Sequence, residues 1–132
     1  MAEFSTSVVD KGDISVINLS GYLDAHTAPT LENNFTELID QNHFKIVVNF
    51  EDLAYISSAG LGVFMAYIEK IRDNKGDIKL TNMNEKVYNI FDLLGFPLLY
   101  EIFKTEDEAI NKFSESDGIG RVRVYLPRKL KI

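Results

Sequence analysis

The sequence predicts an α/β protein in which a mixed β-sheet opens with a hairpin and about four helices pack against it. Three observations indicate this class. Two short runs rich in β-branched residues come first, separated by the turn sequence Asp-Lys-Gly-Asp. A nearly continuous apolar run at 45–50 has the length of a buried strand. Segments with helical spacing of apolar residues then alternate with further strand-like runs.

The hairpin is expected from residues 4–9 and 14–19, which flank that turn sequence. The first helix is expected to start near Ala28. Thr27 is a suitable N-cap, and Pro29 falls in the first turn, where a missing N–H group costs little. Apolar residues recur at helical spacing beyond this point, so the hairpin leads into a helix.

The strand at 45–50 leads to two adjacent serines, after which the apolar period becomes helical. This second helix is expected to end before the polar stretch 73–77, and a strand follows at 78–80. Its predicted apolar face consists of Leu61, Phe64, Met65, Ile68 and Ile71.

A third helix is expected around Val87 and Phe91, where apolar residues again have helical spacing. Gly95 and Pro97 are expected to stop it, because glycine favours a helix C-terminus and proline cannot continue a helix. A short strand is predicted at 98–103.

The C-terminal part begins with residues 105–108, whose capping residue and acids predict the start of a fourth helix. The polar stretch 114–118 has the composition of a linker. Apolar and polar residues then alternate at 121–126 as in a strand. We therefore expect one domain at 1–114 and a basic C-terminal extension at 115–132.

Charge is distributed unevenly along the chain. The net charge is −6, and residues 115–132 contain five cations and two acids, or +3, which leaves −9 in residues 1–114. An acidic domain argues against nucleic-acid binding, because phosphate backbones attract clustered cations. The distribution favours protein partners, or contact of the tail with the domain.

The composition excludes several kinds of site. The chain has no cysteine, so disulfides and thiolate metal sites are impossible. The two histidines, His26 and His43, do not have metal-ligand spacing, and neither a metal nor a cofactor is expected. No apolar run approaches the roughly twenty residues that span a bilayer. With no secretory leader visible, a cytoplasmic location without membrane contact is expected.

Ser57 and Ser58 lie where a strand gives way to the first turn of a helix. Backbone N–H groups point outward there and the helix dipole adds partial positive charge, so a phosphate would be accommodated. One interpretation is that the serines only cap the helix. Gly60 and Gly62 favour a binding site, because these poor helix residues leave room for a partner to approach the hydroxyl.

Other kinds of chemistry find less support in the sequence. The motif lacks the lysine of a phosphate-binding loop and the G-x-S-x-G pattern of a hydrolase. A Ser–His–Asp arrangement with His26 is the distant alternative. Asp24, Glu51 and Asp52 are interpreted as solvated carboxylates. If Asp24 lies near Ser58, it would repel a phosphate there.

Apolar residues near the motif could supply a partner-binding patch, although most are expected to lie in the core. A few exposed ones would suffice for a modest interface. The candidates are Tyr55, Phe64, Met65, Tyr67, Phe91, Leu93 and Phe96.

Residues 55–63, Tyr-Ile-Ser-Ser-Ala-Gly-Leu-Gly-Val, resemble the signature of the STAS domains, and most closely that of the bacterial anti-sigma factor antagonists. A second landmark, Gly-Tyr-Leu-Asp at 21–24 followed by Thr27, resembles the loop that enters the family's first helix. The resemblance covers about 4–113 and includes the order of the elements. It implies a STAS-like mixed sheet for the domain at 1–114.

The resemblance implies a phosphorylation-controlled binding switch and not an enzyme. The unphosphorylated form would bind an anti-sigma factor that is also a serine kinase, phosphorylation would break the complex, and a PP2C-type phosphatase would restore it. Alignment on the glycines places the phosphate on Ser58, with Ser57 as second choice. The family often has aspartate at the position of Ser57 and serine at that of Ala59. The implied partner-binding residues are Asp24, Thr27, Ser57, Ser58, Gly60, Leu61 and Gly62.

The principal alternative is a non-switching STAS scaffold. Such a protein assembles with copies of itself or with other regulatory proteins and uses Ser58 only as a helix cap. For the switch, a monomer or a weak dimer is expected.

Overall fold

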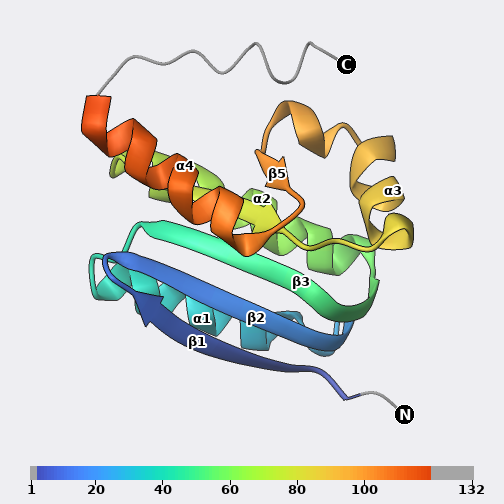
Figure 1. Ribbon diagram of the computed structural model, residues 1–132. Coiled ribbons are helices and arrows are strands. Elements are labelled where there is room, and N and C mark those ends of the chain that lie inside the picture. Colours follow the sequence, from blue (N-terminus) through green and yellow to red (C-terminus); the bar gives the residue numbers. More distant parts are fainter. Residues whose placement is uncertain (1–2, 120–132) are drawn as a thin grey trace.

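The computed structural model describes residues 3–119, with side chains described for residues 3–114. In this part of the chain, strands and helices alternate after an opening hairpin, as predicted (Figure 1). The elements are β1 (Ser5–Lys11), β2 (Ile14–Leu23), α1 (Ala28–Asp40), β3 (Lys45–Ile56), α2 (Ser58–Asp73), β4 (Asp77–Thr81), α3 (Glu85–Leu93), the 3₁₀ helix η1 (Phe96–Leu98), β5 (Ile102–Phe103) and α4 (Glu106–Ile119).

The strands form one mixed sheet in the order β1-β2-β3-β4-β5. β1 and β2 form the antiparallel hairpin, and each of the other neighbouring pairs is parallel. Parallel neighbours need crossover connections, and α1, α2 and α3 provide them. β2 and β3 remain paired as far as Leu23 and Ile56, so the ends of these two strands lie side by side. The predicted mixed sheet with its opening hairpin is confirmed.

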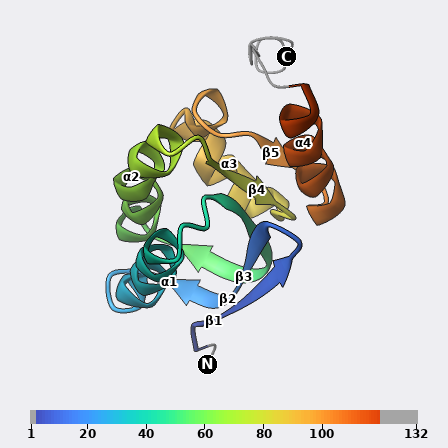
Figure 2. The same cartoon turned by 90° about the vertical axis from the view of Figure 1, so that its left-hand side faces the viewer.

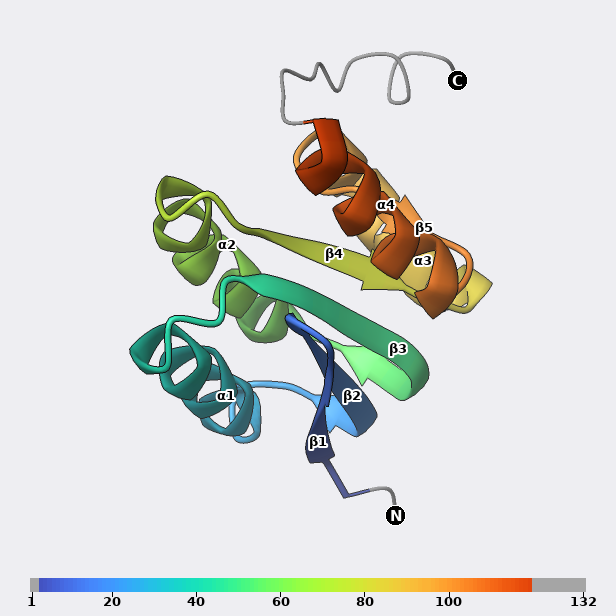
Figure 3. The same ribbon diagram turned by 60° about the vertical axis from the view of Figure 1, so that its left-hand side comes forward.

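Helices cover both faces of the sheet, as Figures 2 and 3 show from two directions. α1, α2 and α3 enclose the main core on one face, where Phe35 and Phe64 are fully buried. α4 lies on the other face, and its Phe113 packs in a smaller cluster with Val47 of β3. The first half of β3 and all of β4 are therefore buried on both faces, which explains the nearly continuous apolar run at 45–50.

β3 is longer than the predicted strand. The run at 45–50 continues to Ile56, so Glu51 and Asp52 lie on the strand and not in a loop. Both carboxylates are exposed, as expected. The strand continues because β2 pairs along it, with Ser20 opposite Asp52.

Two predictions for the C-terminal part are wrong. The linker expected at 114–118 is helical, because α4 continues to Ile119. The strand expected at 98–103 is reduced to the two residues of β5, preceded by η1. The strand expected at 121–126 lies outside the described residues, and the division into a domain and a basic extension stays a prediction.

The predicted apolar face of α2 is correct in part. Leu61, Phe64 and Ile71 are buried, but Met65 is 48% exposed, and Val63 is buried in addition. Because α2 packs against both the sheet and α1, its buried arc is wider and rotated relative to the expected stripe.

Candidate functional site

The two sequence landmarks meet at the adjacent ends of β2 and β3. The backbone N–H of Ser57 donates to the carbonyl oxygen of Leu23 at 2.9 Å. The loop that contains Asp24 and the start of α2 therefore leave the sheet from neighbouring positions. This arrangement supplies one surface to which both segments contribute.

The two serines have different local roles. Ser57 is the N-cap of α2, with an extended backbone (φ −100°, ψ 176°), and its Oγ accepts from the N–H of Gly60 at 3.4 Å. Ser58 is the first helical residue and is exposed. Among residues 3–119, its hydroxyl has no hydrogen-bond partner. The capping interpretation thus applies to Ser57, and the hydroxyl of Ser58 is accessible for modification.

The two glycines also differ. A Cβ on Gly60 would lie 2.8 Å from Cγ of Leu23 and 2.9 Å from Cγ1 of Ile56, so glycine is required for packing inside the protein. The expectation that Gly60 leaves room for a partner is therefore wrong. Gly62 is exposed, and a Cβ there would meet nothing within 4 Å. The surface above Gly62 is open, as expected for a site that another protein approaches.

The loop before α1 is organised by Asp24. Its Oδ1 accepts from the N–H groups of His26 at 2.9 Å and of Thr27 at 3.2 Å. The Thr27 hydroxyl accepts from the N–H of Asp24 at 2.8 Å and donates to the carbonyl of Tyr22 at 2.9 Å. Thr27 occupies the N-cap position without capping through its side chain, so the predicted capping role is wrong.

Asp24 carries its charge at neutral pH. Burial raises the pKa of its carboxyl, but hydrogen bonds from Thr27 and His26 outweigh burial, and the pKa lies below its usual value. The loop therefore holds a charged carboxylate one residue beyond Leu23, whose carbonyl oxygen accepts from Ser57. A like charge added to α2 would be repelled by it.

An exposed aromatic pair extends the site along the strands. Tyr22 and Tyr55 are paired in register on β2 and β3, and their ring centroids lie 5.7 Å apart. They are 47% and 45% exposed. Sequence reasoning included Tyr55 among the patch candidates but missed Tyr22. The signal was present, since Tyr22 is directly followed by the buried Leu23 and neighbouring residues of a strand face opposite sides.

The other predicted patch residues divide between surface and core. Met65 and Leu93 are exposed, and Tyr67 is half-buried. Phe64, Phe91 and Phe96 are buried, as is Leu61 of the motif. Leu61 therefore supports the start of α2 from beneath and presents no side chain to a partner.

Other kinds of site have little support in the described residues. Among the side chains that the structure describes, those of residues 3–114, no three or more His, Asp or Glu are grouped so that they could hold a metal ion. None of the described helices combines the length and the apolar character needed to cross a membrane. The ring of His26 makes no hydrogen bond to either serine within this part of the chain, so the geometry of a catalytic triad is not formed there.

Comparison with known proteins agrees with this geometry. The family model of the STAS domain matches residues 5–109. The anti-sigma-B factor antagonist of Bacillus subtilis is 30% identical over 93 residues, which are 70% of this chain and 84% of that protein.

Two solved structures of the anti-sigma factor antagonist SpoIIAA have a similar fold. The unphosphorylated form has a TM-score of 0.65 at 25% identity, covering 85% of this chain and 98% of SpoIIAA. The phosphorylated form from Bacillus has a TM-score of 0.64 at 26% identity, covering 84% and 99%. Because the family model spans most of the chain, the chain belongs to the STAS domain family, and anti-sigma factor antagonists are among its relatives.

Proposed function

We propose that the protein is a partner switch of the anti-sigma factor antagonist type. Its unphosphorylated form binds an anti-sigma factor that is also a serine kinase, and phosphate on Ser58 releases that partner. The observation that carries the proposal is the division of roles between the serines. Ser57 is used as the helix cap, whereas Ser58 is exposed at the first position of α2. The relatives support it, because they include an unphosphorylated and a phosphorylated antagonist.

A phosphate on Ser58 acts through its charge. The outward N–H groups of the first turn of α2 favour an anion, so the helix tolerates the modification. The phosphate also adds about −1.5 to −2 charges at pH 7 to the surface that the partner covers. Asp24 adds a like charge on the neighbouring loop. Partner binding therefore weakens more than folding does.

The partner-binding surface is centred on the start of α2 and the loop before α1. Gly60 and Leu61 shape it from beneath, because both are buried. The tyrosine pair supplies apolar contact area of the kind that dominates protein interfaces. The surface consists of Tyr22, Asp24, Thr27, Tyr55, Ser57, Ser58 and Gly62.

The remaining parts of the proposal follow from this role. A PP2C-type phosphatase removes the phosphate from Ser58 and restores binding. The protein acts in the cytoplasm as a monomer or weak dimer, without catalysis, cofactor or nucleic acid. The acidic charge of residues 1–114 is consistent with protein partners.

A non-switching STAS scaffold is the alternative. The observation in its favour is that Ser57 gives the motif a structural use that requires no phosphate. In that case the same surface would bind its partners constitutively.

Phosphorylation by the cognate kinase tests the proposal. The full chain is incubated with that kinase and ATP, and phosphopeptides are identified by mass spectrometry. We expect phosphate on Ser58 in the wild type and in Ser57→Ala, the matched control, and none in Ser58→Ala. Phosphate on Ser57 alone would overturn the site, and phosphate on neither serine would favour the scaffold.

Affinity measurements complete the test. Ser58→Ala should bind the kinase like the wild type, because it keeps an uncharged surface. Ser58→Asp should bind more weakly, because it adds a charge beside Asp24. Equal affinities of the two variants would contradict release by charge. Isothermal titration calorimetry gives both values.

A further inference from the structure

Four leucines around the turn between α3 and η1 remain exposed to solvent. Leu93, Leu94, Leu98 and Leu99, here called the leucine surface, are 84%, 56%, 68% and 45% exposed. Exposed apolar groups concentrated within so short a segment usually mark an interaction site. The leucine surface lies on different elements from the serine motif and requires its own explanation.

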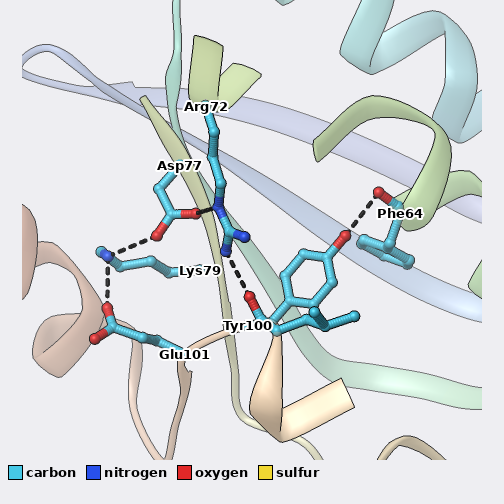
Figure 4. Close-up of polar contacts among 7 residues, drawn as sticks. Phe64, Arg72, Asp77, Lys79, Tyr100 and Glu101 are labelled. Atoms are coloured by element: carbon cyan, nitrogen blue, oxygen red, sulfur yellow. Dashed lines mark hydrogen bonds and ion pairs between the residues drawn. The ribbon is translucent and has the colours of Figure 1, made fainter. Parts of the chain in front are cut away.

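The segment that carries the leucine surface is held firmly (Figure 4). Arg72 at the end of α2 donates to the carbonyl oxygen of Leu99 at 2.6 Å and pairs with Asp77 at 2.8 Å. Tyr100 is buried and donates its hydroxyl to the carbonyl oxygen of Phe64 at 2.7 Å. The leucines are thus exposed on a fixed part of the fold and not on a loosely attached loop.

A buried ionic network anchors the residues that follow (Figure 4). The Nζ of Lys79 lies 2.6 Å from Glu101 and 3.1 Å from Asp77. The side chains of Lys79 and Glu101 are both only 4% exposed. Separating such a buried pair leaves an uncompensated charge, which is strongly unfavourable. The C-terminal side of the leucine surface is therefore firmly attached to β4.

Residues 120–132 are long enough to reach the leucine surface from the end of α4. α4 starts beside β5, which follows η1 closely in the chain (Figure 1). The 14 residues of α4 span about 21 Å. An extended segment of the length of 120–132 spans up to about 43 Å. Returning along α4 uses about half of this length, and the rest is available to contact the leucines.

The composition of residues 120–132 matches this path. The segment contains five cations and no acid, so the net charge of −6 leaves −11 in residues 1–119. The first turn of α4 is acidic, although Glu106 already pairs with Lys11 and Glu108 accepts from the N–H of Thr105. Alternate apolar residues would give an extended segment one apolar face. These residues are Val122, Val124, Leu126, Leu130 and Ile132.

We propose that residues 120–132 fold back along α4 and cover the leucine surface of their own chain. The apolar face packs on the leucines, and the five cations of the segment are attracted by the net negative charge of residues 1–119. The segment lies beyond residues 5–109, which the STAS family model matches, so this cover is added to the common fold. A protein that binds the leucine surface has to displace the segment. This regulation does not depend on Ser58.

Paramagnetic relaxation measured on the full chain tests the proposal. The chain has no cysteine, so a Lys131→Cys variant takes a single nitroxide label. Backbone amide signals of residues 93–99 should lose most of their intensity in the oxidised sample relative to the reduced one. Signals of β1, the exposed edge strand, should keep theirs. Broadening centred on β1, or no selective broadening, would overturn the proposal.

A mixed sample distinguishes a second copy from the chain's own segment. Nitroxide-labelled chain without isotope label is added to isotope-labelled chain without nitroxide. If the cover is intramolecular, the signals of residues 93–99 keep their intensity. Their loss in this sample would identify a second copy as the occupant and refute the proposal.

Substitutions test whether the leucines hold the segment. Leu93→Ser with Leu98→Ser should restore the intensity of the neighbouring signals in the labelled chain. Val8→Ser with Val9→Ser is the matched control, because these residues are 41% and 45% exposed on β1, and it should leave the broadening unchanged. Broadening that survives the leucine substitutions would contradict the proposal. Circular dichroism verifies that both variants are folded.

Discussion

The two ends of α2 are held in different ways. At the N-terminal end, one 3.4 Å hydrogen bond from Gly60 to Ser57 caps the helix, and Ser58 is exposed. At the C-terminal end, Arg72 is fixed by Asp77 and complements the helix dipole. The C-terminal end of the helix, here called the anchored end, is thus fixed by an ion pair, whereas the N-terminal end, here called the open end, presents an exposed hydroxyl. Charge added at the open end is expected to act on a partner more than on the fold.

The largest effect is expected from the ionic network of β4, which includes Asp77, the partner of Arg72 at the C-terminal end of α2. Lys79→Met leaves Asp77 and Glu101 without their shared cation, which should lower the free energy of unfolding by about 3–5 kcal/mol. Lys11→Met is the control, because Lys11 and Glu106 form a more exposed pair, and it should have little effect. Urea unfolding gives both values. Equal losses of unfolding free energy in the two variants would contradict a stabilising role for the buried network.

Two glycines probe the packing at the open end. Gly60→Ala should cost about 1–3 kcal/mol, because its Cβ would press on the buried side chain of Leu23. Gly62→Ala should stabilise the protein by up to about 1 kcal/mol, because alanine favours the helix and the space is free. Thermal melting compares the two. Stability changes of the same sign in both variants would contradict the assignment of Gly60 to a packed site and of Gly62 to an open one.

The hydroxyl of Tyr100 links α2 to the segment after η1. Tyr100→Phe removes its hydrogen bond to Phe64 and should cost about 1 kcal/mol at neutral pH. Tyr67→Phe is the control, since the Tyr67 hydroxyl contacts Thr36 at 3.4 Å near the surface. Denaturant unfolding measures both, and a larger loss for Tyr67→Phe would reverse the expected ranking.

The same tyrosine makes stability depend on pH. Burial raises the pKa of Tyr100 above its ordinary value of 10.0, although Arg72 acts in the opposite direction. The unfolded chain therefore loses this proton first, and stability falls as pH rises above about 10. Tyr100→Phe lacks this contribution, so its stability should decline less steeply than that of the wild type. Parallel slopes in unfolding experiments across this range would refute the assignment.

The smallest effect is expected from the two serines. Ser57→Ala removes the cap of α2 and should cost about 1 kcal/mol of the free energy of unfolding. Ser58→Ala should cost less, because the Ser58 hydroxyl is exposed and does not cap the helix. Thermal unfolding of the unphosphorylated variants compares them. A larger loss of stability for Ser58→Ala than for Ser57→Ala would show that Ser58, and not Ser57, caps the helix.

Much of the fold could be predicted because its signals are local. The start of α1 at Ala28 and the hairpin turn are encoded by adjacent residues. At the start of α4, Thr105 and Glu108 cap each other's N–H groups, as the short motif predicts. The linker prediction at 114–118 was wrong because a polar composition with one glycine does not prevent α4 from continuing through these residues.

The candidate site was predictable in location but not in detail. The sequence placed Ser57 and Ser58 at the start of a helix, yet their different roles depend on the backbone angles of the cap. The adjacency of the Asp24 loop depends on the pairing of β2 with β3. Tyr22 was missed although its alternation with Leu23 indicated it, whereas its contact with Tyr55 depends on the register of β2 and β3.

By itself, the sequence determined the fold class, the order of the elements and the serine motif, because periodicity, turns and caps arise among residues close together in the chain. Only the tertiary structure decided which polar groups are buried and why Gly60 is needed. Lys79 of β4 is stabilised inside the protein by Glu101, which lies between η1 and β5. The position of Gly60 has no room for a side chain because Leu23 packs against it. Such requirements exist only after distant segments have packed together, so no local pattern encodes them.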